Sequence, residues 1–264
     1  MFAMSQKKES GEIDEIYNLR TISGVYYSEE LSGVNEQYHI YLRDHLIPKE
    51  GGDSALELGC GKGLWTQTLC ERYKEIDIVD ISPELLEMVI TNCTHHKCKI
   101  TSHMGKIEDF VKNPNLDRKW KHIYMTFILE HLEFPVDTLK DIAKLMQKDG
   151  CLFIAVPNAD SVHRVIALRA GLIDTAEELS ANDKIVGHRR VYTRNLLVEH
   201  VTSAGFDIIS ESNIGLKPLR LNQMKELKPE IIDGFCASGD LVPNNAAYIA
   251  ITATPVLNRT SDGI

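Results

Sequence analysis

The chain has 264 residues, of which 43% are hydrophobic and 25% charged, a composition typical of a globular protein. Its 29 basic and 38 acidic residues give a net charge of −9 at pH 7, and no long basic run is present, which disfavours nucleic acid as a partner. No apolar run approaches the roughly 20 residues that a membrane span needs. We therefore expect a cytoplasmic protein that acts on a small molecule or a peptide.

The N-terminal part is predicted to be a tail followed by a lid. Residues 1–15 are polar and charged and match neither a signal peptide nor a recognisable targeting sequence, so we expect a disordered tail. Residues 16–48 precede the first predicted strand and are rich in tyrosine, which combines a rigid apolar body with a polar tip. A lid over a ligand and ordinary core packing both explain this composition. The tyrosines are Tyr17, Tyr26, Tyr27, Tyr38 and Tyr41.

The most informative segment is Ala55-Leu-Glu-Leu-Gly-Cys-Gly-Lys-Gly-Leu-Trp65. An apolar run leads directly into Gly59, Gly61 and Gly63, and an amphipathic stretch follows. This order predicts a buried parallel strand, a tight turn and a helix whose N-terminus faces a ligand. Glycine permits the backbone angles of such a turn and lets a ligand lie against the main chain. A dinucleotide fingerprint would have a third glycine three residues after the second, where this chain has Leu64.

Short apolar runs alternate with amphipathic ones between residues 54 and 156, which is typical of βαβ units and a parallel sheet. The expected strands of this part are 55–58, 76–80, 99–103, 122–127 and 151–156. The expected helices are 64–73, 83–92 and 135–147. Further along, the pattern predicts a helix over 195–204 and two strands, 206–210 and 248–252, that pair antiparallel at one edge of the sheet.

Two segments look like additions to this sheet. Residues 157–190 contain no clear strand and are predicted to form helices and loops. Residues 214–247 form a long excursion with three prolines, and such excursions are usually functional lids or mobile loops. We expect one domain over 16–256, followed by a tail over 257–264.

Asp80 ends the second predicted strand, 19 residues after Gly61. A carboxylate at that point can accept hydrogen bonds from both ribose hydroxyls of a nucleoside that lies across the strand ends. The alternative is a helix N-cap or turn residue, but Ser82 already supplies a cap. We therefore predict that Asp80, with Ile81 beside it, binds a nucleoside cofactor.

Two motifs carry a resemblance to a known family. Glu57-Leu-Gly-Cys-Gly-Lys-Gly63 resembles the first motif of the class I S-adenosylmethionine-dependent methyltransferases, and Leu129-Glu-His131 followed by Pro135 resembles the ubiquinone-biosynthesis O-methyltransferases. The resemblance implies an α/β fold with a doubly wound, seven-stranded Rossmann-like sheet, one antiparallel strand, helices on both faces and helical lid insertions. It also implies methyl transfer from S-adenosylmethionine, with S-adenosylhomocysteine as product, to an oxygen or nitrogen of a small molecule such as an acidic metabolite or natural product.

The resemblance assigns further cofactor contacts beyond the glycines and the acidic residue. Ile107 is expected to pack on the adenine, with Glu108 or a backbone amide making the polar contact. Lys106 stands where the family often has an acidic residue, and a capped helix start is the alternative explanation of this segment. Thr126 marks the methionine end of the cofactor, and Arg43 is the candidate partner of its carboxylate.

His131 and His188 are the candidate catalytic residues, because imidazole titrates near neutral pH and can act as a base. The alternative for His131 is a structural hydrogen bond to a loop carbonyl. In the ubiquinone enzymes a further Glu joins the Glu-His pair and the three can hold a divalent metal. Phe127 stands at that position here, so no metal is predicted. The tract Cys93-Thr-His-His-Lys-Cys98 lacks a second Cys/His pair at zinc-finger distance, so it is predicted to be a polar loop with free thiols.

The acceptor is expected to contact the region after the fifth strand. Val156-Pro-Asn158, His163-Arg164 and Gly187-His-Arg-Arg-Val-Tyr-Thr193 resemble the segments that close over the acceptor pocket in many small-molecule methyltransferases. An arginine there could hold an acidic acceptor through bidentate contacts, whereas surface ion pairs with the acidic tract 177–183 are the alternative. The candidate acceptor-binding residues are Tyr27, Asn158, Arg164, Arg189, Arg190 and Tyr192.

Other classes of protein stay open at this point. An NAD-dependent oxidoreductase would also need a glycine turn and an acidic residue, but Leu64 and the Leu-Glu-His motif argue against it. A methyltransferase-like binding or regulatory protein without catalysis and a peptide or protein N-methyltransferase are the further alternatives. The sequence does not distinguish a monomer from a homodimer.

Overall fold

The computed structural model describes residues 33–256. The predictions for residues 1–15, 16–32 and 257–264, which include Tyr27, lie outside the described residues. The strands are β1 (Gly52–Leu58), β2 (Tyr73–Asp80), β3 (Lys99–Met104), β4 (Trp120–Thr126), β5 (Met146–Pro157), β6 (Phe206–Ile214) and β7 (Tyr248–Pro255). The helices are α2 (Val34–Leu46), α3 (Leu64–Arg72), α4 (Pro83–Asn92), α5 (Ile107–Val111), α6 (Pro135–Lys144), α7 (Val162–Arg169), α8 (Ala181–Ile185), α9 (Arg194–Ser203), α10 (Leu221–Met224) and α11 (Pro229–Ala237), with a 3₁₀ turn at Gly239–Leu241.

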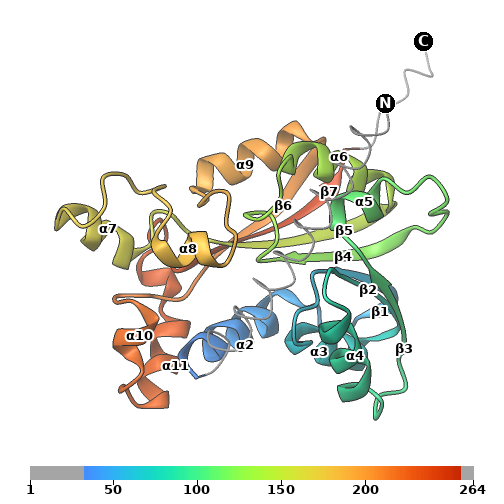
Figure 1. The fold of residues 1–264 in the computed structure, drawn as a ribbon, viewed down its shortest axis with the longest axis horizontal. Helices are drawn as coiled ribbons and strands as arrows, with labels where there is room; N and C mark the ends of the chain where they lie inside the picture. The colour runs from blue at the N-terminus through green and yellow to red at the C-terminus, as the bar shows by residue number, and fades with distance from the viewer. Residues whose placement is uncertain (1–32, 257–264) are drawn as a thin grey trace, which may run out of the picture.

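In the described part of the chain, seven strands form one sheet in the order β3-β2-β1-β4-β5-β7-β6 (Figure 1). The pairs from β3 to β5 are parallel, and β7 runs antiparallel to both of its neighbours. The prediction of a seven-stranded α/β sheet with one antiparallel strand is therefore confirmed. The expected antiparallel pairing of the last two strands at one edge is confirmed as well.

Helices cover both faces of the sheet, because side chains of each strand alternate between two hydrophobic clusters. Tyr124 of β4 belongs to the cluster that α2, α3 and α4 cover. Its neighbours Ile123 and Met125 belong to the cluster under α5, α6 and α9. In Figure 1 these two groups of helices lie on opposite sides of the strands. Among the described residues, no helix combines the length and the apolar character that crossing a bilayer would need.

The boundary between α6 and β5 differs from its prediction. A helix over 135–147 was expected, but α6 ends at Lys144 and β5 begins at Met146, which pairs with Trp120. In the first half of β5 three consecutive exposed polar residues, 147–149, precede Gly150, so this part of the strand has no apolar run. The apolar run of 151–156 therefore identified only the buried half of the strand.

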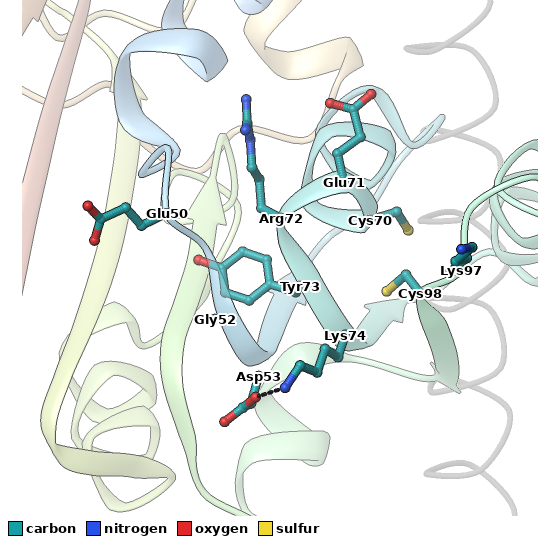
Figure 2. Close-up of a pocket in the computed structure, with 10 residues that line it drawn as sticks. All are labelled: Glu50, Gly52, Asp53, Cys70, Glu71, Arg72, Tyr73, Lys74, Lys97 and Cys98. Carbon is teal, nitrogen blue, oxygen red and sulfur yellow. Dashed lines mark hydrogen bonds and ion pairs between the residues drawn. The ribbon is translucent and has the colours of Figure 1, made fainter.

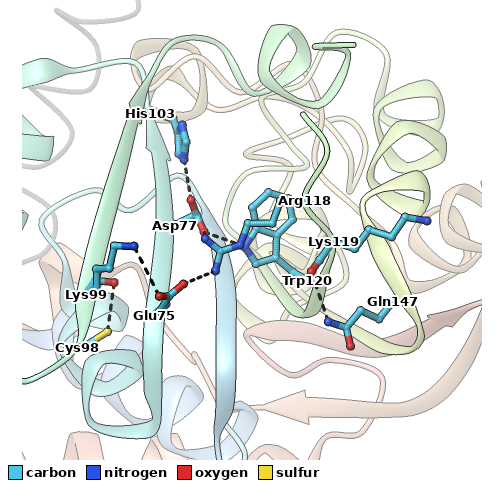
Figure 3. A network of polar contacts seen from close by, with 9 residues as sticks. All are labelled: Glu75, Asp77, Cys98, Lys99, His103, Arg118, Lys119, Trp120 and Gln147. Carbon is cyan, nitrogen blue, oxygen red and sulfur yellow. Dashed lines mark hydrogen bonds and ion pairs between the residues drawn. The ribbon is translucent and has the colours of Figure 1, made fainter. Parts of the chain in front are cut away.

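A polar network on β2 holds the β3 side of the sheet to the chain that enters β4 (Figure 3). The buried carboxylate of Asp77 accepts hydrogen bonds from Trp120 Nε1 (2.9 Å) and is 2.8 Å from His103 Nε2. Arg118 bridges Asp77 and Glu75 at 3.0 and 2.9 Å. The network satisfies its buried groups internally, which makes it a structural element.

The two predicted additions are helical and lie beyond the carboxyl ends of the strands. The segment after β5 contains α7 and α8, and the excursion between β6 and β7 contains α10 and α11. In Figure 1, α7 and α8 lie across from α10 and α11, with α2 between the latter and the sheet. The hydroxyl of the fully buried Tyr38 on α2 donates to the Leu216 carbonyl at 2.6 Å. This tyrosine therefore packs in the core and attaches α2 to the excursion.

Candidate active site

The glycine turn after β1 has the backbone conformation that its sequence predicts. Gly59, Gly61 and Gly63 have φ values of 80°, 51° and 83°, in the left-handed region that side chains disfavour. A Cβ on Gly59 would also clash with the side chain of Ile128. The turn leads directly into α3, whose first N–H groups have no partner within the helix. These features form a close-approach surface for a ligand at the carboxyl edge of the sheet.

Asp80 connects this turn to the end of β2. Its carboxylate accepts hydrogen bonds from Gly61 N at 3.1 Å and from Ser82 N at 3.0 Å. Burial raises the pKa of Asp80 even though these hydrogen bonds lower it. The Asp80 carboxylate is therefore buried and held by backbone N–H groups of the glycine turn and of the residues that follow β2. Ser82 caps α4, as predicted, by accepting from Leu85 N.

The other predicted cofactor residues gather at the same edge. Thr126 is the last residue of β4, and the buried Ile107 begins α5, with the half-buried Glu108 next to it. Gly105 N donates to the Asp80 carbonyl at 3.0 Å, which brings the loop before α5 against the end of β2. The residues are thus placed where a nucleoside lying across the strand ends would meet them. Their contacts with a cofactor stay predictions.

Arg43 of α2 also reaches the glycine turn. Its Nη1 donates to the Leu64 carbonyl at 3.3 Å, at the first residue of α3. Its guanidinium also pairs with Asp44 at 2.7 Å. The N-terminal helix is therefore fixed beside the predicted cofactor site, and Arg43 is near enough to remain the candidate partner of a cofactor carboxylate.

Phe127, just after β4, has a structural role that sequence reasoning missed. Its φ of 58° makes it the one non-glycine residue in the described part of the chain with a positive φ. Its ring stacks on His39 of α2 (centroids 4.2 Å apart) and meets the edge of Tyr248 at 5.1 Å. Left-handed backbone at a bulky residue is strained and persists only when its surroundings hold it. The three rings close the space between α2 and the strand ends.

A cavity of about 830 Å³ opens beyond these rings. It is lined by α2, by the ends of β5 and β7, by residues of the α7–α8 segment and by residues 217–222 before and within α10. The lining includes Phe127 and His188 but none of the three glycines of the turn. The cavity is therefore distinct from the glycine turn, and its lining comes nearest to the predicted cofactor residues in sequence at Phe127, directly after Thr126.

His188 lies between two acidic side chains at the wall of the cavity. Its Nδ1 is 2.9 Å from Asp183 Oδ1, and its Nε2 is 3.9 Å from Glu130 Oε1. Burial raises the pKa of Asp183, but the hydrogen bonds from His188 and Ser180 outweigh it and hold that pKa well below its usual range. Asp183 is thus ionised and fixes the orientation of the imidazole. The sequence motif indicated His188, but neither acidic partner was predicted as part of a site.

Glu130 is the most unusual group of the site. Its side chain is 1% exposed, and neither carboxylate oxygen has a hydrogen-bond partner. Burial raises its pKa to about 7, although the nearby His188 lowers it. The Leu-Glu-His motif therefore places a carboxyl group that titrates near neutral pH beneath the cavity wall.

His131 is placed differently from its prediction as a base. Its ring is held by the Gly187 backbone and packs edge-on against His188, with centroids 4.7 Å apart. Burial, followed by the charge of His188, lowers the pKa of His131 to about 3. His131 is absent from the residues that line the cavity. These observations favour the structural alternative, a histidine that bonds a loop carbonyl.

Glu130, His131 and His188 could together hold a metal ion, because one ligand atom of each lies within 4.8 Å of the others. Among the described residues this is the one such group. The prediction of no metal rested on Phe127 in place of a third ligand and did not consider His188. His188 is 57 positions beyond His131 in the sequence, and the fold brings it to the Glu-His pair. The absence of a catalytic metal stays a prediction. The Cys93–Cys98 tract is not part of this group, and both of its thiols interact with that of Cys70.

The two arginines of the predicted clamp, Arg189 and Arg190, contact the loop after β4. The guanidinium of Arg190 donates to the carbonyls of Leu129, Leu132 and Glu133 and so fixes the loop after β4. Arg189 is exposed and lies 4.0 Å from Glu133. Neither arginine lines the cavity. These contacts attach two loops to each other, and a contact of either arginine with an acceptor stays a prediction.

Tyr192 and Arg164 are also engaged within the protein. Tyr192 is fully buried, and its hydroxyl is 3.1 Å from His200 Nδ1, so it packs in the core and away from the cavity. Arg164 lines the cavity, but its guanidinium donates to the Ala176 and Glu178 carbonyls and lies 3.6 Å from Asp183. Arg164 therefore shapes the cavity wall by holding the chain between α7 and α8.

Asn158 lines the cavity but has its amide occupied. Its Nδ2 donates to the carbonyls of Asn244 and Ala246, and its Oδ1 accepts from Asp160 N. These bonds hold the end of β5 to the chain that enters β7. A contact between Asn158 and an acceptor would need one of them to be exchanged, and it stays a prediction.

A second hollow of about 550 Å³ lies at the opposite edge of the sheet (Figure 2). It is formed where the chain enters β1 and β2, so it is far from the glycine turn at the carboxyl end of β1. Its charged residues neutralise each other, as in the exposed pair Lys74–Asp53 at 2.8 Å. This hollow has no part in the candidate site.

Comparison with known proteins agrees with this geometry. Residues 35–211 match the family described as a methyltransferase domain. The chain therefore belongs to this family, within the class of the S-adenosylmethionine-dependent methyltransferases. A curated relative is the ubiquinone biosynthesis O-methyltransferase of Actinobacillus pleuropneumoniae, 27% identical over 109 residues, which are 40% of this chain and 47% of that protein. The chain thus spans about half the length of the curated relatives it matches.

Solved structures show the same fold. The S-adenosylmethionine-dependent methyltransferase of Mesorhizobium loti matches with a TM-score of 0.60 at 13% identity, over 84% of this chain and all of that one. The N-methyltransferase NodS of Bradyrhizobium japonicum, solved with S-adenosylhomocysteine, matches with a TM-score of 0.55 at 13% identity, over 90% of this chain and 98% of that one. At these identities the likeness concerns the fold.

Proposed function

We propose that this chain transfers the methyl group of S-adenosylmethionine to an oxygen or nitrogen of a small-molecule acceptor. The observation that carries the proposal is the glycine turn: three glycines adopt left-handed conformations, and the backbone N–H of Gly61 donates to the buried carboxylate of Asp80. Beside this turn lies a separate cavity large enough for a small molecule. A nucleoside donor and an acceptor can therefore meet at the end of β4.

The residues of the site mainly bind and align. Asp80 would accept the ribose hydroxyls, Ile107 would pack on the adenine, and Thr126 would contact the amino-acid end. When bound, S-adenosylmethionine supplies a methyl group already activated by its sulfonium, so correct alignment provides most of the rate. The stacked rings of Phe127 and His39 cover this junction and would exclude water from it.

His188 is the residue that we assign to proton removal from the acceptor. It lines the cavity, and the ionised Asp183 holds its Nδ1 and would stabilise a proton on the imidazole. Glu130 lies on the other side and would stabilise the same positive charge when it is ionised. Such a base is needed only for an acceptor that is protonated at the working pH.

The cofactor assignment is tested by calorimetric titration of the full chain with S-adenosylhomocysteine and with NAD. We expect micromolar or tighter binding of the former and none of the latter. Asp80→Asn should weaken S-adenosylhomocysteine at least about tenfold, because a lost charge-assisted hydrogen bond is worth about 1.5 kcal/mol or more. Asp149→Asn, at an exposed carboxylate in the first half of β5, is the matched control. Preferred binding of NAD, or equal affinity of both variants, would refute the assignment.

A binding protein without catalysis would pass that test, so turnover is measured separately. The assay follows formation of S-adenosylhomocysteine from S-adenosylmethionine in the presence of hydroxylated, amino and carboxylated small molecules. Turnover that depends on one of these acceptors supports methyl transfer. Tight cofactor binding with no turnover on any acceptor or on peptides would favour the regulatory alternative.

A further inference from the structure

Three of the six cysteines lie together where α3 ends and β3 begins. The thiol of Cys70 hydrogen-bonds to the thiols of Cys93 and Cys98, and all three are free. Cys70 belongs to the last turn of α3, Cys93 follows the end of α4, and Cys98 directly precedes β3. Two further segments of the chain therefore each place a sulfur atom against that of Cys70, at the amino edge of the sheet.

Regular secondary structure fixes the positions of Cys70 and Cys98. Helix α3 runs into β2 without a loop, and Cys70 lies three residues before that strand. The pairing of β3 with β2 begins at Glu75 and Lys99, so Cys98 enters the sheet beside the start of β2. The two thiols therefore meet across the junction of α3 and β2, where a helix and a strand pair hold them.

Cys98 is the most accessible thiol of the three. Its side chain is half-buried, whereas those of Cys70 and Cys93 are 6% and 2% exposed. Cys98 and Cys70 both line the hollow of about 550 Å³ at this edge of the sheet, and Figure 2 shows their side chains close to each other there. A small reagent that enters the hollow therefore reaches Cys98 with a second thiol next to it.

The contact between the two thiols favours the ionised form of Cys98. The hydrogen bond from Cys70 lowers the pKa of Cys98, although burial raises it. Cys151 on β5 is also half-buried, but burial raises its pKa. The thiolate is the form of cysteine that attacks a disulfide. Of these two half-buried cysteines, Cys98 therefore carries more of the reactive form at neutral pH.

We propose that Cys98 and Cys70 form a reversible dithiol–disulfide site that reacts with low-molecular-weight disulfides of the glutathione type. The Cys98 thiolate attacks one sulfur of the reagent, and the other half of the reagent leaves as a thiolate. Cys70 then attacks the Cys98 sulfur and gives its proton to the second half, which leaves as a thiol. Two electrons pass from the two cysteines to the reagent, which ends as two thiols.

Cys70, and not Cys93, is the second thiol of this reaction. The hydrogen bond from Cys70 is the largest influence on the pKa of Cys98, whereas Cys93 acts on Cys98 through its charge alone. The disulfide would join residues that are 28 positions apart and enclose β2 and α4. Because such a cross-link restricts the unfolded chain, oxidation is expected to stabilise the fold.

The test maps the disulfide in the wild-type full chain. The protein is incubated with glutathione disulfide at pH 7, the remaining thiols are alkylated, and the digested peptides are analysed by mass spectrometry. We expect a linkage between Cys70 and Cys98 that forms at least about tenfold faster than a glutathione adduct of Cys151, because the rate follows the thiolate fraction and the access of the thiol. Dithiothreitol should restore both thiols.

Variants separate the two steps. In Cys70→Ser the glutathione adduct should remain on Cys98, and in Cys98→Ser the linkage should be lost. Cys151→Ser removes the other half-buried thiol and should form the linkage as the wild type does. Oxidation should raise the melting temperature of the wild type by about 5 °C or more, and this difference should disappear in Cys70→Ser.

Three results would overturn the proposal. They are glutathione that stays on Cys98 of the wild type while Cys70 can still be alkylated, reaction of Cys151 as fast as that of Cys98, and a linkage of Cys70 to Cys93 in place of Cys98. The linkage is mapped in the wild type, so a variant that fails to fold leaves the test intact. The outcome is also independent of the proposed methyl transfer, because neither cofactor nor acceptor is added.

Discussion

Replacing Glu130 with glutamine isolates the cost of a buried carboxylate without removing its shape. The wild-type group is 1% exposed, has no hydrogen-bond partner, and has a pKa raised by burial to about 7. In the unfolded chain the same carboxyl titrates at its ordinary value of 4.5. The folded protein therefore binds one more proton than the unfolded chain between these two pH values.

The sign and size of the effect follow from proton linkage. Stability falls as pH rises wherever the folded state binds more protons, so Glu130 is neutral and harmless below pH 4.5 and increasingly costly up to about pH 7. A tenfold change in proton affinity corresponds to about 1.4 kcal/mol. The interval from 4.5 to about 7 therefore makes the wild type lose about 3 kcal/mol relative to Glu130→Gln.

The measurement is urea unfolding of both proteins at several pH values from 5 to 8. The quantity of interest is how the difference in unfolding free energy between the two proteins changes with pH. A pH-independent destabilisation by the glutamine amide therefore cancels. We expect Glu130→Gln to gain on the wild type steadily up to about pH 7 and then level off. A difference that stays flat across this range, or that moves in favour of the wild type, would refute the raised pKa and with it the buried position of this carboxyl.

Three further predictions concern the rest of the site. Gly59→Ala should cost about 2 kcal/mol or more and abolish cofactor binding, because its Cβ meets Ile128, whereas Gly171→Ala, with φ of 67° and open space, should cost about 1 kcal/mol in denaturant unfolding and leave binding intact. His188→Gln and Asp183→Asn should each lower kcat about a hundredfold and change the pH profile of kcat, and a lower melting temperature with normal kcat would show a structural role instead. Removal of divalent metals with EDTA should leave kcat within about twofold; a loss restored by Zn²⁺ or Fe²⁺, the ions that imidazole ligands suit, would assign a metal to the Glu–His–His group.

The parts of the fold that could be predicted are those that depend on residues close together in the sequence. The left-handed turn at Gly59, Gly61 and Gly63 depends on which residues lack a Cβ, and the Ser82 cap depends on its own helix start. Asp80 was located because it ends a strand at a fixed distance from the turn. Each of these features is set by local backbone chemistry.

The acceptor side could not be predicted in the same way because its contacts join distant segments. His188 meets Glu130 only when the loop after β4 packs under the α8 segment, so the motif gave the histidine without its partners. Arg190 looked like a ligand-binding residue from its sequence, yet it binds three carbonyls of that loop. The contact of Phe127 with Tyr248 spans 121 positions and leaves no local signal.

The single antiparallel strand makes the acceptor half of this protein exchangeable. Tyr248, the first residue of β7, pairs with Pro157 at the end of β5 and with Ile214 at the end of β6. The chain therefore leaves the sheet at Pro157 and again at Ile214, and it re-enters at Tyr248 between these two residues. The excursion before β7 thus begins and ends at the same edge of the sheet. A segment grafted between Ile214 and Tyr248 would therefore reshape the proposed acceptor cavity, while the strands that carry the predicted cofactor residues keep their register.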